Sequence, residues 1–126
     1  MTKHKANYDK LMTITVFAAA LTIRGVGAVI NSDGEAEAPA AGVMPDVIFT
    51  EGGVPQGEAV QGAMPNGGII PVVAGAPIAV GDEVTTDAEG KFIPAATGNA
   101  IVGKAVTAGA VDEYVGIQFT YKGAKA

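Results

Sequence analysis

The sequence predicts an all-β protein, a compact small β-barrel or sandwich of short strands with an extended N-terminal arm. Its large aliphatic residues are 15 Val and 10 Ile against two Leu, and β-branched side chains fit a pleated sheet better than a helix. Eighteen Gly and seven Pro interrupt the chain at short intervals, which is typical of short strands joined by tight turns. A chain of 126 residues makes one small domain, and a core this poor in aromatic residues would gain stability from oligomerisation.

Residues 1–24 are expected to form an arm and a first strand, ahead of a β-rich domain at residues 25–126. Residues 1–10 (MTKHKANYDK) are polar and basic, so a partner would be needed to order them. Residues 13–17 (TITVF) alternate polar and apolar side chains, which is the pattern of a half-buried strand. A cleaved secretory signal peptide is the rival interpretation, because a basic start, an apolar run and an Ala-x-Ala motif at residues 18–20 follow one another. The apolar run is too short to span a membrane.

Between residues 25 and 63 the sequence indicates turns, one loop and two strands. Residues 25–27 (GVG) predict a strand bend, since the third glycine and the helix of a dinucleotide-binding loop are missing. Residues 31–34 (NSDG) are a dense turn signal, and residues 35–42 (EAEAPAAG) are typical of an acidic loop. Strands are expected at residues 46–50 and 59–61.

The second half of the chain contains further strand candidates, each bounded by Gly, Pro, Asn or Asp: residues 69–73, 83–86, 91–94, 100–106 and 114–121. Residues 87–90 (DAEG) place Asp first and Gly fourth, as a type I turn prefers. We therefore predict a β-hairpin of residues 83–86 and 91–94. Seven or eight short strands in all indicate a compact barrel or sandwich.

Charge is distributed unevenly along the chain. Residues 25–90 contain ten carboxylates and no Lys or Arg, whereas residues 1–24 carry a net charge of +3 and residues 91–126 a net charge of +2. Opposite potentials steer and register association, so we expect a basic end to lie on an acidic surface of another copy or of a larger partner. The overall charge of −5 argues against nucleic acid as a partner, because phosphate contacts need clustered Lys or Arg.

The inventory of residues excludes several chemistries. The chain has no Cys and one each of His, Ser and Arg, so it lacks a thiol nucleophile, a disulfide, a histidine metal cluster and a Ser-His-Asp triad. The acidic run at residues 82–89 lacks the spacing of a calcium-binding loop and fits solvated turns better. We therefore expect no enzyme activity, no cofactor, no metal and no small-molecule substrate.

An enzyme or carrier remains a competing class with definite requirements. A carbohydrate-active enzyme would need a concave site with perturbed carboxylates. Residues 80–84 (VGDEV) resemble the entry to a biotinyl or lipoyl carrier barrel, but the expected lysine hairpin of that family is missing. The carrier interpretation is therefore set aside, although its small β-barrel geometry fits.

Several segments, taken together, resemble one family: residues 70–75 (IPVVAG), 78–84 (IAVGDEV), 87–95 (DAEGKFIPA), 101–105 (IVGKA) and 115–117 (VGI). Their order is similar to that of the small capsid decoration, or cement, proteins of tailed bacteriophages. That order is a V-x-x-G-x-x-I-x-x-G-D-x-V stretch, a D-x-x-G-K hairpin, an Ala-rich strand, V-G-x-A and a terminal V-x-V strand. The likeness covers about residues 69–121, and residues 33–62 fit the Ala-, Gly- and Pro-rich front half of the family more loosely.

The resemblance implies a β-barrel-like domain, commonly a homotrimer, on the outer capsid surface of the virion. Its partner would be the major capsid protein, whose neighbouring subunits it would staple after the shell expands, with no nucleic acid, membrane or small molecule as partner. We hypothesise that the arm and the first strand extend across the partner and add main-chain hydrogen bonds. The candidate capsid-contact residues are Lys3, Lys5, Tyr8, Lys10, Leu11, Ile14 and Val16. The alternatives are a disordered tail for the arm and, for the whole protein, a secreted β-rich surface-binding or adhesion module.

Overall fold

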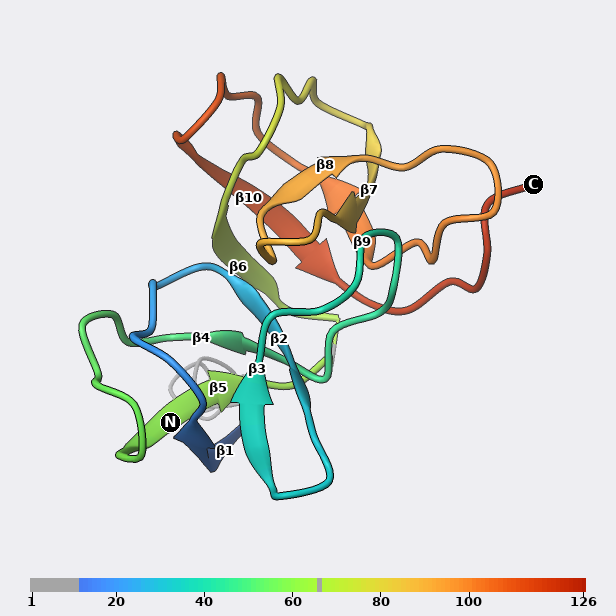
Figure 1. Cartoon of the computed structure of the whole chain (residues 1–126). Coiled ribbons are helices and arrows are strands. Elements are labelled where there is room, and N and C mark those ends of the chain that lie inside the picture. The colour runs from blue at the N-terminus through green and yellow to red at the C-terminus, as the bar shows by residue number, and fades with distance from the viewer. Residues whose placement is uncertain (1–11, 66) are drawn as a thin grey trace, which may run out of the picture.

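The computed structural model describes residues 12–65 and 67–126, and these residues form ten β-strands and no helix. The strands make two lobes (Figure 1), a closed barrel and a separate five-stranded sheet. The predicted all-β class is confirmed, with two small β-structures in place of one. Within the described residues, no helix is long and apolar enough to cross a membrane.

The first lobe closes five strands into a barrel in the order β1-β3-β2-β4-β5. They are β1 (Thr13–Ala18), β2 (Gly27–Ile30), β3 (Glu35–Glu37), β4 (Val47–Phe49) and β5 (Ala59–Ala63). β1 pairs antiparallel with β5 along five residues but parallel with β3 at two positions, Phe17 with Glu35 and Ala18 with Ala36. One aromatic side chain, Phe49, and otherwise small or β-branched side chains fill the narrow interior: Val16, Ala18, Ala28, Ala36, Val47 and Val60.

The second lobe is a sheet in the order β6-β10-β9-β7-β8. Its strands are β6 (Ile69–Val73), β7 (Glu83–Thr86), β8 (Phe92–Pro94), β9 (Gly103–Ala105) and β10 (Tyr114–Phe119). The two edges of this sheet meet, because Ala74 bridges Phe92 and the Gly75 N–H donates to the Phe92 carbonyl at 2.7 Å. Pro71 lies on the edge strand β6, which is where a residue without an N–H is tolerated.

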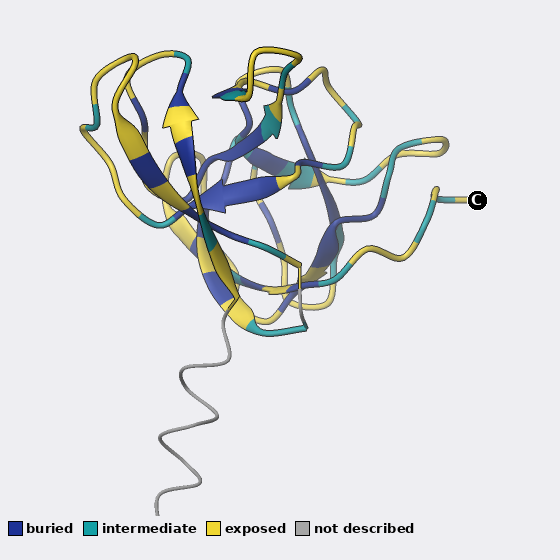
Figure 2. Ribbon diagram, turned by 90° about the horizontal axis from the view of Figure 1, so that it is seen from below, coloured by how far each residue is buried: buried dark blue, intermediate teal, exposed yellow. Residues whose placement is uncertain are grey.

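The lobes share a core and backbone hydrogen bonds. Ile48 of β4 and Ala63 of β5 are completely buried within the hydrophobic cluster of the second lobe. The Gly27 N–H donates to the Gly90 carbonyl at 2.8 Å, and the Val73 N–H donates to the Gly25 carbonyl at 3.0 Å. Figure 2 shows the buried residues concentrated along the strands, with exposed residues on the turns. The two lobes therefore form one packed body.

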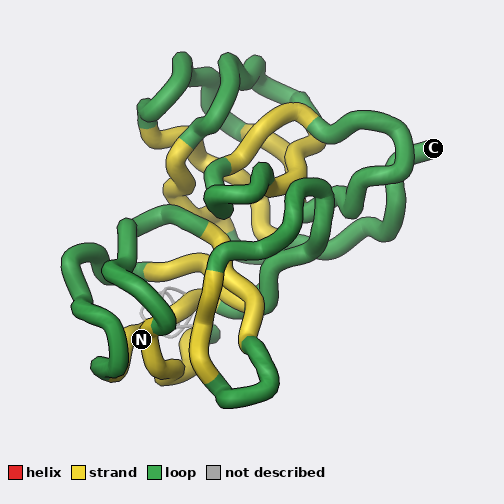
Figure 3. The backbone as a smooth tube through the Cα atoms, in the orientation of Figure 1, coloured by secondary structure: helices red, strands yellow, loops and turns green. Residues whose placement is uncertain are grey.

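Most expected strands are present, and the exceptions lie in the barrel and in β9. The hairpin of β7 and β8 is confirmed, with the register Thr85 opposite Ile93. The expected loop at residues 35–42 is wrong in its first part, because Glu35–Glu37 forms β3 between β1 and β2. Gly27–Ile30 forms β2, which the turn signals around it had obscured. Figure 3 shows that loops make up much of both lobes. β9 covers only Gly103–Ala105 of the strand predicted at residues 100–106.

Candidate functional site

The structure separates the predicted contact residues into two groups. Those that lie outside the described residues are Lys3, Lys5, Tyr8, Lys10 and Leu11. Ile14 is half-buried against the barrel core, and Val16 is buried within it. The outward face of β1 carries Thr13, Thr15 and Phe17, all of them exposed. The alternation of residues 13–17 already predicts that Phe17 lies on the outward face, because it places Phe17 on the side of the strand opposite Val16.

One edge of β1 is open near its start. The Met64 N–H donates to the Met12 carbonyl at 2.7 Å, and the Ala18 N–H donates to the Glu58 carbonyl at 2.9 Å. Main-chain groups alternate between the two sides of a strand, so those of Thr13 and Thr15 face away from β5. On that side, no strand of the described chain pairs with residues 13–16. An open edge of this kind can accept a strand from a partner.

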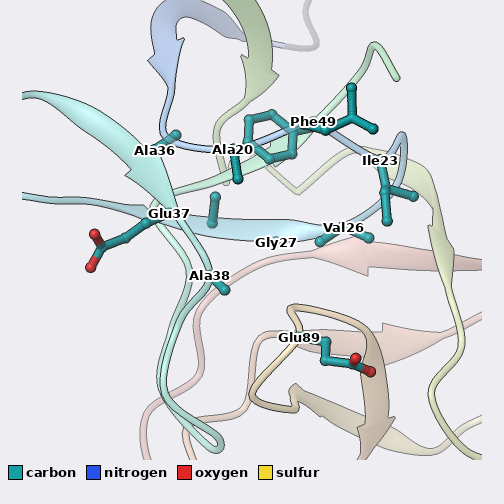
Figure 4. A pocket seen from close by; sticks show the side chains of 11 residues that line it. Ala20, Ile23, Val26, Gly27, Ala36, Glu37, Ala38, Phe49 and Glu89 are labelled. Carbon is teal, nitrogen blue, oxygen red and sulfur yellow. The ribbon is translucent and has the colours of Figure 1, made fainter. Parts of the chain in front are cut away.

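An apolar hollow of about 110 Å³ lies at the end of the barrel where β1 finishes. Phe49, Val26 and several alanines line it, and Leu21 and Ile23 beside it are 67% and 53% exposed. In the close view (Figure 4) the Glu37 carboxylate points away from these apolar side chains. The hollow therefore suits an apolar side chain better than a polar ligand.

A second hollow of about 210 Å³ lies where the two lobes meet, lined by Arg24, Phe49, Thr50, Ile70 and Pro71. The Tyr114 hydroxyl donates to the Arg24 carbonyl at 3.4 Å, so the second lobe holds the backbone beside the hollow. Small-molecule sites usually exceed about 300 Å³. Both hollows are smaller than that, and their geometry favours contact with a partner protein.

Ion pairing differs sharply between the lobes. In the described chain, all four ion pairs lie in the second lobe. The Lys125 Nζ donates to Glu83 Oε1 at 3.0 Å and the Lys122 Nζ to Oε2 at 3.4 Å, and these hydrogen bonds hold the pKa of Glu83 below its ordinary value. A hydrogen bond to Asp112 at 3.0 Å raises the pKa of Lys91.

The carboxylates of the barrel lack ion-pair partners among the described residues. Residues 13–63 contain one Arg and six carboxylates, and none of these carboxylates forms an ion pair with another described residue. The six are Asp33, Glu35, Glu37, Asp46, Glu51 and Glu58. They are spread along the lobe, and no three His, Asp or Glu side chains of the described residues come together as a metal site would require. The barrel therefore presents an acidic surface.

Two of three comparisons with known proteins find similar proteins. A family model described as phage cement protein matches residues 6–117. Among solved structures, the N base of the head fiber gp8.5 of bacteriophage phi29 aligns with a TM-score of 0.73 at 22% sequence identity, covering 91% of this chain and 98% of that one. This likeness shows a shared fold. None of the curated proteins compared with the chain matches it.

Proposed function

The chain belongs to the phage cement protein family, whose members are structural proteins of virions, and from this premise we propose that it binds the outer surface of a phage capsid. There it would bridge neighbouring major capsid proteins and stabilise the assembled shell. The observation that carries the proposal is the family match over residues 6–117, which includes the whole barrel and the second lobe up to the middle of β10. Many copies that bind the assembled shell alone stabilise it by mass action.

The surface of the molecule supports this role. Its hollows are small and mainly apolar, and large apolar side chains such as Leu21 and Ile69 are exposed. Surfaces of this kind are typical of protein contacts, which bury apolar side chains inside a polar rim. We propose no catalytic role and no cofactor. Family membership also favours a virion protein, made in the host cytoplasm, over the secreted adhesion module.

We propose that the arm makes the first contact with the capsid. Residues 1–11 hold Lys3, Lys5 and Lys10 against one Asp, so they suit an acidic surface. They lead directly into the open edge of β1, where a strand of the capsid protein would pair with Thr13 and Thr15. Tyr8 and Leu11 would anchor the arm, while Ile14 and Val16 hold β1 to the barrel.

Co-sedimentation with capsids tests both the function and the arm. We expect the wild-type protein to sediment with expanded capsids and not with unexpanded ones. A variant lacking residues 1–10 retains all of β1, so it should fold and bind at least about tenfold more weakly. A second variant with Lys3→Gln, Lys5→Gln and Lys10→Gln keeps the length of the arm and isolates the contribution of its charge.

The outcomes separate the two ideas. Failure of the wild-type protein to bind expanded capsids would overturn the proposed function. Unchanged capsid affinity of both variants would show that the arm does not contribute to binding, and the proposed capsid function would remain. If the truncated variant binds weakly and the triple Lys→Gln variant binds normally, pairing along the edge of β1 matters more than charge.

A further inference from the structure

We propose that two oppositely charged surfaces of this chain, one on each lobe, bind each other between copies and join the copies head to tail into a closed ring. The inference rests on the proposed function together with the homotrimer that the family resemblance implies, and it assigns the faces that would hold such a trimer together. Each face is built entirely from described residues, and the pairing register of the strands defines its composition.

The first surface is a row of side chains that crosses four strands of the second lobe. Ile69 of β6 is paired with Gln118 of β10, Gln118 with Lys104 of β9, and Lys104 with Glu83 of β7. Directly paired residues place their side chains on the same face of a sheet. Ile69, Gln118 and Lys104 are exposed and Glu83 is half-buried, so the row lies on the outer face.

This row is basic. Glu83 is bonded to Lys122 and Lys125, and Lys104 forms no ion pair with any described residue. Three lysines therefore surround one glutamate and leave an excess of positive charge. We call this the basic surface and define it by Ile69, Lys104, Val106, Gln118, Lys122 and Lys125.

Two exposed apolar side chains lie beside the basic row. Gly116 follows on β10, and a Cβ atom there would lie 3.2 Å from Val106 Cγ2 and 3.6 Å from Ile69 Cγ2. These two side chains therefore flank a position without a side chain, and they are 40% and 63% exposed. Val106 and Ile69 therefore cover the backbone at Gly116 and present exposed apolar surface that a partner can bury.

The second surface lies on the barrel and centres on Phe17, which is 55% exposed. Its neighbours in register are Ala59 on β5 and Glu35 on β3, and neither provides a large apolar side chain beside the ring. Glu37 and Glu58 are exposed close to these neighbours in the chain. We call this the acidic surface and define it by Phe17, Glu35, Glu37 and Glu58.

The two surfaces complement each other in charge and in their apolar side chains. On the acidic surface an exposed aromatic ring lies beside carboxylates, and on the basic surface Ile69 and Val106 lie beside lysines. The surfaces belong to different lobes of one packed body (Figure 1), so they pair between copies. A contact between two different faces is heterologous and closes into a ring when the rotation allows it.

The partner is a second copy because the same chain supplies both halves of the match. The competing occupants are the basic arm, which would cover the acidic surface of its own copy, and the major capsid protein, which would cover either surface. Both of these leave the free protein monomeric in solution, so its oligomeric state decides between them and the ring.

Sedimentation equilibrium of the full chain, with a double-mutant cycle, tests the pairing. Lys104→Glu alone and Glu35→Lys alone each place like charges opposite each other, and we expect association to weaken at least about tenfold. The double variant restores opposite charges at every contact of the ring and should recover most of the association. Glu113→Gln, which precedes β10 at the end away from Gln118, is the charge control: it removes a carboxylate outside both surfaces, keeps an oxygen that can accept the Ala110 N–H, and should behave as wild type.

Each outcome supports or overturns the inference. A wild-type protein that is monomeric at all concentrations overturns it, as does a Lys104→Glu variant that associates normally or a double variant that stays dissociated. Phe17→Ser changes no charge and should also weaken association, which checks the apolar part. Capsid binding is measured separately: if the charge swap behaves as expected and capsids are not bound, the proposed function fails and the ring stands.

Discussion

At the scale of single residues, two glycines with the same backbone conformation have different structural roles. Gly90 has a φ of +82° and Gly34 a φ of +78°. Gly90 is buried, and a Cβ atom there would collide with the Gly27 carbonyl. Gly34 is exposed and has no atom within 4 Å of such a Cβ. Position 90 therefore requires glycine for two reasons: the left-handed backbone conformation and the lack of space for a Cβ atom.

We predict that Gly90→Ala destabilises the protein much more than Gly34→Ala. The left-handed conformation costs a non-glycine residue about 1–2 kcal/mol at either position. At Gly90 the collision also disturbs the hydrogen bond from the Gly27 N–H, so the total should reach about 3 kcal/mol or more. Urea unfolding of the two variants measures the difference, and equal losses would show that the lobes do not depend on this contact.

At the scale of elements, β1 joins the barrel through one long pairing and one short seam. Its inward residues fill the interior, and Val16 is 5% exposed. Its outward residues are free for a partner. The alternation in the sequence therefore separates folding from binding within a single strand.

We predict that Val16→Ala lowers the free energy of unfolding by about 2 kcal/mol, because it leaves a small cavity in the barrel. Thr15→Ala, one residue earlier on the exposed face, should change it by less than about 0.5 kcal/mol. Chemical denaturation provides the measurement. If Val16→Ala is as stable as Thr15→Ala but binds capsids more weakly, Val16 contacts the capsid rather than stabilising the barrel.

Sequence reasoning succeeded where an element depends on its own residues. The hairpin of β7 and β8 follows from Asp87 and Gly90, and the structure contains the expected bonds: the Gly90 N–H donates to the Asp87 carbonyl and the Lys91 N–H to Asp87 Oδ1, both at 3.0 Å. β3 was missed because the residues of Glu35–Glu37 have low strand propensity. Its pairing with β1 and β2, rather than its own sequence, makes it a strand.

The two candidate surfaces also differ in whether local sequence predicts them. The absence of Lys and Arg between residues 25 and 90 predicts the acidic character of the barrel. The sequence does not predict the basic row, because the row brings together residues from β6, β7, β9 and β10 that are distant in the chain. Register between distant strands depends on the packed core, and no local pattern encodes it.

At the scale of the whole molecule, the shared core makes the two lobes one folding unit. Ile48 is a barrel residue, yet it is completely buried in the cluster that contains Phe92 and Phe119 of the second lobe. Each lobe alone is small, and small cores are marginally stable. Burying a barrel side chain in the core of the other lobe couples their unfolding.

We predict that Ile48→Ala destabilises both lobes together, by about 3 kcal/mol. Backbone amides of β5 and of β10 should then exchange with solvent faster by a similar factor, on the order of a hundredfold. Ile30→Ala, at a side chain that is 38% exposed, is the control and should have a much smaller effect. Faster exchange confined to one lobe would contradict coupled unfolding.

The edge strands of the second lobe, β6 and β8, are protected from pairing with other molecules, which matters at high protein concentration. Pro71 interrupts the row of donors on β6, and Ala74 and Gly75 occupy the outer side of β8. Neighbouring molecules that collide along this lobe find no continuous ladder to extend, which is how natural sheets resist fibril formation. High local concentration should therefore not seed amyloid through the edges of this lobe.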